Sequence, residues 1–440
     1  MRLAGWGNYP HVDCRVISGA GLPSLRERVT TEPSLIARGN GRSYGDAALN
    51  QKATLLTRGH DHIIAFEPDS GLLVAESGLL LGDLIDIFIP RGWFPPVTPG
   101  TRWVSLGGMV AADVHGKNHH GAGSFCNHVE SLELILADGT VVSCSRSQHA
   151  DLFAATCGGM GLTGLISSLS FRLKPIRTAW IRQQTMRCAN LAEAMAQIEA
   201  ARHWTYSVAW IDCLSAGPDA GRCLLYLGEH AEPDELDAAR RATPLVWPTR
   251  RSVPVPVNFP EWVLNGFSLR AFNEVYYRAA RPGSALVDWQ SYFYPLDRLS
   301  DWNRIYGRSG LLQYQCVLPG EASAAGLGQL LRSVARAGMG AFLAVLKQFG
   351  DHPGGDLSFP MAGYTLAMDF PMRPRSLALL NELDAIVADH GGRLYLAKDA
   401  RMTAAMLRKG YAGLERFQAL RHRSGAASRF TSRLAERLEL

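Results

Sequence analysis

Short, mainly apolar segments separated by tight turns and loops dominate the first third of the chain, a pattern typical of strands. We predict strands at 34–38, 62–66, 72–76, 132–136 and 141–144. Asp69-Ser70-Gly71 and Asp138-Gly139 are turn sequences that make hairpins of the last four. Apolar residues at helical spacing predict a helix over roughly 79–90, which Pro95, Pro96 and Pro99 prevent from continuing. A helix near 151–157 and an apolar strand ending at Phe171 follow.

Beyond Pro175 the pattern changes to longer strands rich in aromatic and β-branched residues, separated by helices. We predict strands at 206–213, 290–294, 311–318, 342–349 and 364–370, and helices at 190–202, 322–337 and 375–390. The proline-rich stretch 244–262 predicts an irregular loop. Such an arrangement favours an α+β fold in which helices cover one face of an antiparallel sheet. We expect one domain at 1–178, a second at 179–392, and a C-terminal segment, 393–440, that returns to the first domain.

Composition agrees with a globular protein, since 47% of the 440 residues are hydrophobic and 19% are charged. There is no run of about 18 apolar residues, so we expect no transmembrane helix. The first residues lack the apolar stretch of a signal peptide, which favours a cytoplasmic location. The eight cysteines show neither CxxC nor zinc-ligand spacing. We therefore expect buried free thiols and no disulfides.

Positive charge is concentrated at the end of the chain. Nine lysines and arginines and only three acidic residues lie between 401 and 440, against a net charge of +5 for the whole sequence. One interpretation is a set of solvated helix faces. The other is attraction to phosphate, either on a cofactor or at the inner face of a membrane, which would make peripheral membrane contact possible. No basic patch with interleaved aromatic residues indicates a nucleic-acid partner.

Three glycine clusters are the strongest chemical feature of the sequence. They are Gly39-Asn40-Gly41-Arg42-Ser43-Tyr44-Gly45, then Gly100-Thr101 with Gly107-Gly108 and His115-Gly116-Lys117-Asn118-His119-His120, and finally 158–164. Glycine lets backbone N–H groups approach a diphosphate closely. The first cluster departs from a Rossmann fingerprint, because its last glycine comes one residue late and no amphipathic helix follows. The three histidines could bind a metal or could be part of a structural turn, but a phosphate- or flavin-contacting turn fits their neighbours better, so we predict no metal site.

In this order and spacing the clusters resemble the FAD domain of the vanillyl-alcohol oxidase and p-cresol methylhydroxylase (PCMH) superfamily. Over nearly its whole length the chain is similar, within that superfamily, to the decaprenylphosphoryl-β-D-ribose 2′-oxidase family. The specific matches are His115-Gly116-Lys117-Asn118-His119-His120 and Ala397-Lys398-Asp399. Leu312-Gln313-Tyr314-Gln315 and the closing segment 433–440 add to them.

The resemblance implies an FAD-dependent oxidoreductase with a two-subdomain PCMH-type FAD domain and a substrate domain. It implies that the protein oxidises a secondary hydroxyl of a polyprenyl-phosphate-linked pentose to a ketone, as the first half of an epimerisation in the making of a cell-envelope arabinose precursor. A lipid-linked sugar would be the substrate, and a reductase or epimerase a possible partner. Two alternatives stay open, namely a soluble alditol, sugar or aldonolactone oxidase of the same superfamily, and a flavin-binding partner protein without catalysis.

The resemblance also implies roles for individual positions. The implied FAD-contacting residues are Gly39, Asn40, Gly41, Arg42, Ser43, Tyr44, Gly100, Thr101, Ser105, Gly108, Ala112, His115, Asn118, Ile166 and Tyr395. The implied substrate-contacting residues are Gln313, Gln315, Lys347, Thr365 and Lys398, of which Lys398 is the first candidate for catalysis, assisted by Gln315 and His115. Independently, strand periodicity places Gln313 and Gln315 on one face, where they are either solvent-facing or line a pocket.

Two differences from the relatives change these expectations. Mycobacterial members carry Asn and Cys where this chain has Thr365 and Ala367, so one wall of the substrate pocket differs. Superfamily members that bond flavin covalently often carry His in the first loop. This chain has Arg42-Ser43 there, and we expect FAD to be bound without a covalent link.

Overall fold

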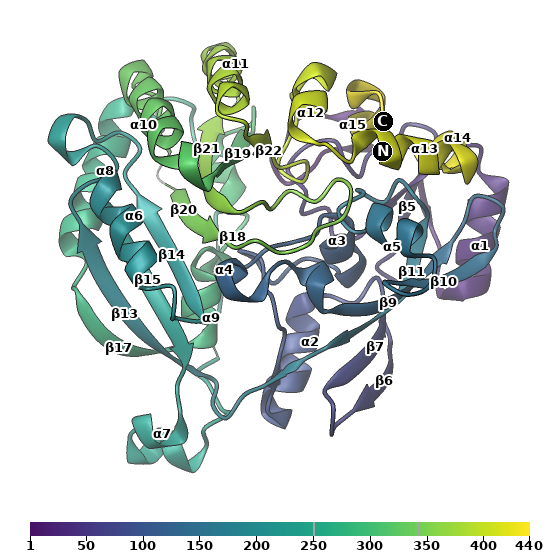
Figure 1. Ribbon diagram of the computed structural model, residues 1–440, viewed down its shortest axis with the longest axis horizontal. Coiled ribbons are helices and arrows are strands. Elements are labelled where there is room, and N and C mark those ends of the chain that lie inside the picture. The colour runs from purple at the N-terminus through teal and green to yellow at the C-terminus, as the bar shows by residue number, and fades with distance from the viewer. Residues whose placement is uncertain (250, 342) are drawn as a thin grey trace.

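The computed structural model describes residues 1–249, 251–341 and 343–440. The first part of the chain contains two main sheets, beside the two-stranded pairs of β1 (Arg2–Leu3) with β2 (Val12–Asp13) and of β8 (Trp93–Phe94) with β12 (Lys174–Pro175). The strands and helices of this part are seen in Figure 1. One main sheet is parallel, with the order β3-β5-β4, and consists of β3 (Val16–Ser18), β5 (Thr54–Leu56) and β4 (Ile36–Arg38). The other has the order β10-β9-β11-β7-β6, and all its neighbours are antiparallel. Helices α1 (Gly21–Thr31), α2 (Leu81–Phe88), α3 (Leu106–Ala111) and α5 (Ala150–Thr156) accompany these sheets.

Both predicted hairpins are confirmed. The first consists of β6 (Ile63–Glu67) and β7 (Leu72–Glu76), and the second of β9 (Val129–Ile135) and β10 (Val141–Ser145). Gly71 and Gly139 occupy positive φ at the two turns, which a residue with a Cβ rarely adopts. The apolar strand expected before Phe171 is β11 (Leu165–Arg172), which lies between β9 and β7 in the sheet and is buried over most of its length.

The second part of the chain forms an eight-stranded sheet of order β17-β13-β15-β14-β20-β21-β19-β22, with antiparallel neighbours throughout. Its strands are β13 (Trp180–Cys188), β14 (Tyr206–Ile211), β15 (Cys223–His230), β17 (Gly283–Asp288), β19 (Leu311–Pro319), β20 (Ala344–Phe349), β21 (Gly363–Pro371) and β22 (Arg393–Leu394). Helices α6 (Leu191–Ala200), α10 (Gly320–Ala337) and α11 (Pro374–Asp389) pack against it. The predicted α+β fold with a helix-covered antiparallel sheet is therefore confirmed.

One predicted element was wrong, and several elements of the structure were not predicted. The strand expected at 290–294 is instead the short helix α9 (Trp289–Phe293). The Asp288 carboxylate accepts a hydrogen bond from the Ser291 N–H at 2.9 Å and caps this helix, and Pro295 follows it. Strands β13, β15 and β17 and helix α8 (Gly266–Ala279) were not predicted. Residue 342, where one predicted strand begins, and residue 250, within the predicted loop, lie outside the described residues.

The C-terminal segment lies beside the first sheets (Figure 1). It consists of α12 (Ala404–Gly410), α13 (Leu414–Arg423), α14 (Ala426–Arg429) and α15 (Arg433–Leu438). Leu35 N–H donates to the Arg429 carbonyl at 2.8 Å, and Thr431 N–H donates to the Leu35 carbonyl at 3.1 Å. These bonds attach the end of the chain to the strand that leads into the first glycine cluster.

Several arginines of this segment form ion pairs or hydrogen bonds with other parts of the chain. Arg416 pairs with Asp356, Arg423 with Asp151, and Arg437 with Asp46 and Asp399. Arg421 is buried and donates to the carbonyls of Leu162 and Phe430. The arginine-rich end of the sequence therefore serves largely to hold the segment onto the rest of the fold.

Two further expectations concern cysteines and membrane spans. All eight cysteines are buried free thiols, as predicted. Within the described ranges, no helix has the length and apolar character that crossing a bilayer requires.

Candidate active site

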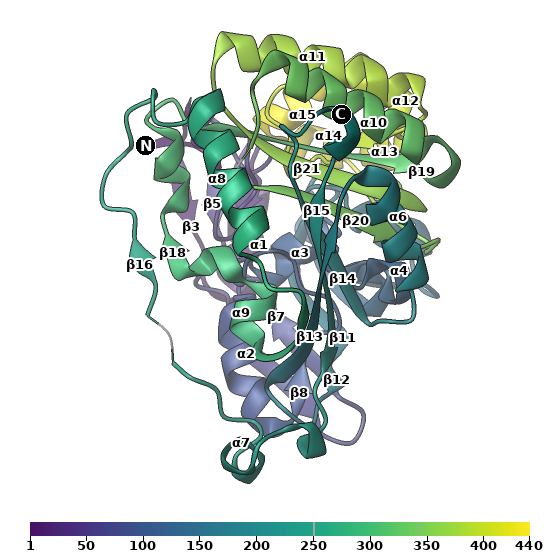
Figure 2. The ribbon, with the colours of Figure 1, turned by 90° about the vertical axis from the view of Figure 1, so that its left-hand side faces the viewer.

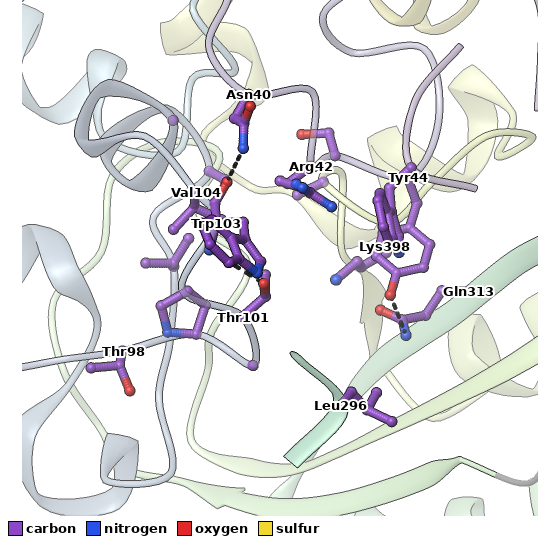
Figure 3. A pocket seen from close by; sticks show the side chains of 18 of the residues that line it. Asn40, Arg42, Tyr44, Thr98, Thr101, Trp103, Val104, Leu296, Gln313 and Lys398 are labelled. Atoms are coloured by element: carbon purple, nitrogen blue, oxygen red, sulfur yellow. Dashed lines mark hydrogen bonds between the residues drawn. The ribbon is translucent and has the colours of Figure 1, made fainter. Parts of the chain in front are cut away.

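A cavity of about 710 Å³ lies where the three glycine clusters meet the eight-stranded sheet. This volume is in the range of pockets that enclose a large organic ligand, roughly 300–1,000 Å³. Figure 3 shows some of its lining residues, with the first loop on one side, the 98–104 segment on the other, and Gln313 and Lys398 at one end.

The first glycine loop begins where β4 ends at Arg38. Gly41 has φ +64°, and a Cβ on Gly39 would lie 2.1 Å from Ser105 Oγ. Both positions therefore require glycine. Asn40 Nδ2 donates to the Trp103 carbonyl at 2.8 Å and holds the loop against the second cluster (Figure 3). The backbone N–H groups of residues 39–43 donate to no other residue that the structure describes, so they are available to an anion in the cavity.

Arg42 adds a cation to this loop. Its guanidinium lies 4.2 Å above the ring of Trp6, and its Nε is buried without a partner among the described residues. Burial lowers the pKa of Arg42, and Asp297 opposes that effect. An unsatisfied guanidinium nitrogen at a cavity wall is expected to bind an oxyanion.

The second and third clusters line the opposite wall. Ser105 caps α3 by accepting from the Gly108 N–H at 3.3 Å. Thr101 Oγ1 donates to Asp297 at 3.1 Å, which ties this wall to the segment after α9. Lining residues here include Gly100, Gly108, Ala112, Met160, Gly164 and Ile166.

His115 is the centre of a contact between the two parts of the fold. Gln315 Nε2 lies 3.0 Å from His115 Nε2, and Lys347 Nζ lies 3.1 Å from His115 Nδ1. Burial and the nearby Lys347 lower the pKa of His115 well below its ordinary value, so the imidazole is neutral. Burial, together with Lys398, lowers the pKa of Lys347 to about 7. A neutral imidazole and an amine near its titration point can exchange a proton with a ligand.

Lys398 forms a second polar group with residues from three segments. Its Nζ lies 3.9 Å from the centre of the Tyr44 ring (Figure 3). Gln313 Nε2 donates to Asp369 Oδ1 at 2.6 Å and lies 3.3 Å from the Tyr44 hydroxyl. Burial lowers the pKa of Lys398, and the negative charge of Asp369 opposes that effect. Tyr395 closes the wall nearby, where its hydroxyl donates to the Ala112 carbonyl at 2.8 Å.

All but two of the residues singled out from the sequence line this cavity. Gln313 and Gln315 share the face that lines it, which agrees with the pocket-lining interpretation. The exceptions are Asn118 and Thr365. Asn118 Nδ2 donates to the Pro96 carbonyl at 2.8 Å and supports the loop from behind. Thr365 Oγ1 donates to the Cys316 carbonyl at 2.8 Å and lies behind Gln315.

The clustered histidines have separate partners. His119 Nδ1 accepts from the Gly350 N–H at 3.3 Å, whereas His120 Nε2 lies 2.8 Å from the Trp204 carbonyl. Among the described residues, no group of three or more His, Cys, Asp or Glu side chains could hold a metal ion.

Several lining residues were missed from the sequence. Lys117 lies in the predicted flavin-contacting turn but was given no role of its own; burial and Lys347 lower its pKa to about 7. Its Nζ donates to the Tyr292 carbonyl and lies 4.2 Å from that ring's centre. Trp6, Trp210, Tyr226, Tyr276 and Asp297 also line the cavity. They come from five separate segments, and no motif around any of them indicates a place in the cavity.

The free N–H groups, the unpaired Arg42 nitrogen and the close approach that glycine permits fit the diphosphate of FAD. The fold and this cavity define an FAD-dependent oxidoreductase with a PCMH-type domain. Comparison with known proteins supports that class, because residues 27–145 match the family described as FAD binding domain. Those residues include the first two glycine clusters.

Similar proteins define the family more narrowly. The decaprenylphosphoryl-β-D-ribose oxidase of Mycolicibacterium smegmatis is 35% identical over 450 aligned residues, covering 100% of this chain and 97% of the relative. An uncharacterized protein in the mprA 5′ region of Streptomyces coelicolor is 36% identical over 82% of this chain and 100% of its own length. A putative D-arabinono-1,4-lactone oxidase of Neurospora crassa is 28% identical over only 35% of this chain. The chain belongs to the decaprenylphosphoryl-β-D-ribose oxidase family.

Proposed function

We propose that this enzyme oxidises the 2′-hydroxyl of a pentose carried on a polyprenyl phosphate, producing the 2′-ketone as the first half of an epimerisation. The observation that carries the proposal is the pair of amines that line the cavity together with the glycine loops, Lys347 from strand β20 and Lys398 from the turn after strand β22. Two half-buried amines beside two glutamines suit a sugar whose anomeric oxygen carries a phosphodiester. The decaprenylphosphoryl-β-D-ribose oxidase of Mycolicibacterium smegmatis, a relative that matches the full chain, carries the name of such an oxidase.

The first domain, proposed at 1–178, would hold FAD. We assign the diphosphate to Gly39, Asn40, Gly41, Arg42, Ser43 and Tyr44, and the remaining cofactor contacts to Gly100, Thr101, Ser105, Gly108, Ala112, His115, Ile166 and Tyr395. Asn118 would act indirectly, by supporting the loop at Pro96. Because the first loop carries Arg42-Ser43, the association would be non-covalent.

The second domain, proposed at 179–392, would present the sugar, and the C-terminal segment, 393–440, would add Tyr395 and Lys398. FAD, when bound, supplies the acceptor for the hydride that leaves the 2′-carbon. The hydroxyl proton must leave to a base at the same time, which leaves a neutral ketone. Lys398 would contact the reacting oxygen, while His115 and Lys347 form a neighbouring relay that can accept the proton.

Gln313 and Gln315 would orient the sugar by hydrogen bonds. Gln315 Nε2 already lies 3.0 Å from His115 Nε2 and 3.3 Å from Thr365 Oγ1, so its orientation is fixed from both sides. In this arrangement Thr365 positions Gln315 and does not reach the substrate itself. Side chains that are already held in place lose little entropy on binding, which favours the reactive alignment.

The proposed setting is the cytoplasmic face of a membrane, where the enzyme would meet its lipid-linked substrate and pass the ketone to a reductase or epimerase. Anaerobic mixing tests the substrate class. A polyprenylphosphoryl ribose should bleach the visible flavin absorbance, whereas free pentitols and aldonolactones should not. Bleaching by the soluble compounds alone would favour a soluble-sugar oxidase, and the absence of bleaching by any of them would favour a non-catalytic flavin protein.

A further inference from the structure

Helix α8 carries apolar side chains on the side that faces away from the protein. Its inner side holds Leu269, which is 5% exposed, and the buried Asn273, whose Nδ2 donates to Asp212 at 2.7 Å. On the other side Phe267 and Val275 are 83% and 67% exposed. An ordinary surface helix has one apolar stripe, facing the core. A second stripe on the solvent side indicates something that covers it.

Neighbouring segments extend this apolar surface. Val253, Val257 and Trp262 precede α8 and are 62%, 62% and 75% exposed. Figure 2 shows β16 (Val253–Pro254), β18 (Leu299–Ser300) and α8 together on one side of the molecule. We call Val253, Val257, Trp262, Phe267, Phe272 and Val275 the outer apolar face.

The outer apolar face is continuous with the cavity. Phe272 stacks on Tyr276 with ring centres 5.8 Å apart, and Tyr276 packs against Trp210 at 4.8 Å. Tyr276 and Trp210 both line the cavity, as do Ser252 and Leu299 from the β16 and β18 side. The packed rings of Phe272, Tyr276 and Trp210 thus lead from the surface to the cavity.

The charge around this face is positive. Between 244 and 281 the sequence has five arginines and two glutamates. Arg251, Arg270 and Arg281 are exposed. Apolar side chains surrounded by arginines complement a bilayer surface that carries anionic headgroups, where each basic residue near the surface adds attraction.

We propose that the outer apolar face docks on an anionic phospholipid bilayer, with its apolar side chains among the headgroups and acyl chains. The cavity mouth then opens toward the lipid, and the isoprenoid of the substrate can remain in the bilayer while its sugar enters. This inference rests on the proposed function for the nature of the substrate, whereas the docking itself does not depend on catalysis.

Vesicle flotation of the FAD-loaded enzyme tests the docking. The probe is a vesicle of phosphatidylglycerol and phosphatidylcholine, compared with phosphatidylcholine alone. The variant is Phe267→Asp/Val275→Asp, in which neither changed residue lines the cavity. Ile64→Asp is the matched control, because Ile64 is also an exposed apolar residue, at 57%, but lies on strand β6 and not on the outer apolar face. Removing two large apolar side chains from the interface should weaken partitioning by roughly tenfold or more.

The expected result is that wild type and Ile64→Asp float equally with anionic vesicles, while the double variant stays in the bottom fraction. Flotation of the first two proteins should weaken as the salt concentration rises. Equal flotation of all three proteins, or no flotation of wild type, would overturn the proposal. So would concentration-dependent dimerisation of wild type, measured by sedimentation, that the double substitution abolishes. A water-soluble short-chain polyprenylphosphoryl ribose should bleach the flavin in all three. Failure of that reaction would refute the proposed function and leave the docking result unaffected.

Discussion

Arg437 joins the two loops that border the active site, and its replacement by methionine should destabilise the protein. Its guanidinium lies 2.8 Å from Asp46 Oδ1 and 2.8 Å from Asp399 Oδ2, and it donates to the Met402 carbonyl at 2.6 Å. Asp46 follows the first glycine loop and Asp399 follows Lys398. The side chains of the two acids are only 5% and 4% exposed. Burial favours the neutral form of Arg437, but the two carboxylates outweigh it and raise its pKa.

The expected loss follows from leaving two buried carboxylates without their cation. Breaking a buried ion pair by removing one partner costs about 3–5 kcal/mol. An entropy of unfolding near 2 cal/mol/K per residue gives roughly 0.9 kcal/mol/K for this chain, so the melting temperature should fall by about 3–5 °C. Arg408→Met is the matched control, because Arg408 and its partner Glu439 are 58% and 63% exposed. An exposed pair contributes only about 0–1 kcal/mol, so this control should change the melting temperature by about 1 °C or less.

Thermal unfolding of the FAD-loaded proteins, followed by circular dichroism and by flavin release, measures both variants. Adding Asp399→Asn to Arg437→Met should recover part of the loss, because one buried charge is removed with its partner. If Arg437→Met melts within 1 °C of wild type, or no lower than Arg408→Met, the reasoning about the buried clamp is wrong.

Three further predictions concern the cofactor and the chemistry. Gly41→Val should abolish FAD retention because Gly41 has φ +64°, whereas Gly121→Ala, with no atom within 4 Å of the added Cβ, should keep stoichiometric FAD by absorbance. Lys398→Met should remain folded and yellow but show at least ~100-fold slower flavin reduction in stopped flow; a rate near wild type would remove Lys398 from the catalytic residues. Because the pKa of Lys347 is lowered to about 7 and its neutral amine is the form that accepts a proton, flavin reduction should accelerate as pH rises through about 7. Lys347→Met should abolish that inflection, and an unchanged profile would exclude Lys347 from the proton relay.

Local signals in the sequence predicted much of the fold. The hairpins were predictable because two short apolar segments flank a glycine-containing turn within a few residues of each other. Strand β13 was missed because Arg182, Gln183 and Gln184 in its middle are all half-buried and show no alternation. The error at α9 has a related cause, since a run rich in aromatic residues favours a strand locally while the Asp288 cap and its packing impose a helix.

The site was predictable where chemistry is concentrated in a short motif. The glycines and His115 stand in such motifs, and strand periodicity grouped Gln313 with Gln315. The contact of Lys347 with His115 joins positions 232 residues apart, which no local pattern reveals. Arg437 and Tyr276 acquire their importance in the same way, through tertiary contacts alone.

The central claim is that the site removes hydride from the 2′-carbon of a polyprenylphosphoryl pentose. It is tested most directly by anaerobic single-turnover reduction of the flavin with polyprenylphosphoryl ribose deuterated at the 2′-carbon, compared with the substrate deuterated at the 3′-carbon. The account predicts a primary isotope effect on flavin bleaching for the 2′-deuterated substrate and none for the other. A primary effect from the 3′-deuterated substrate, or bleaching that is equally fast with both, would contradict it.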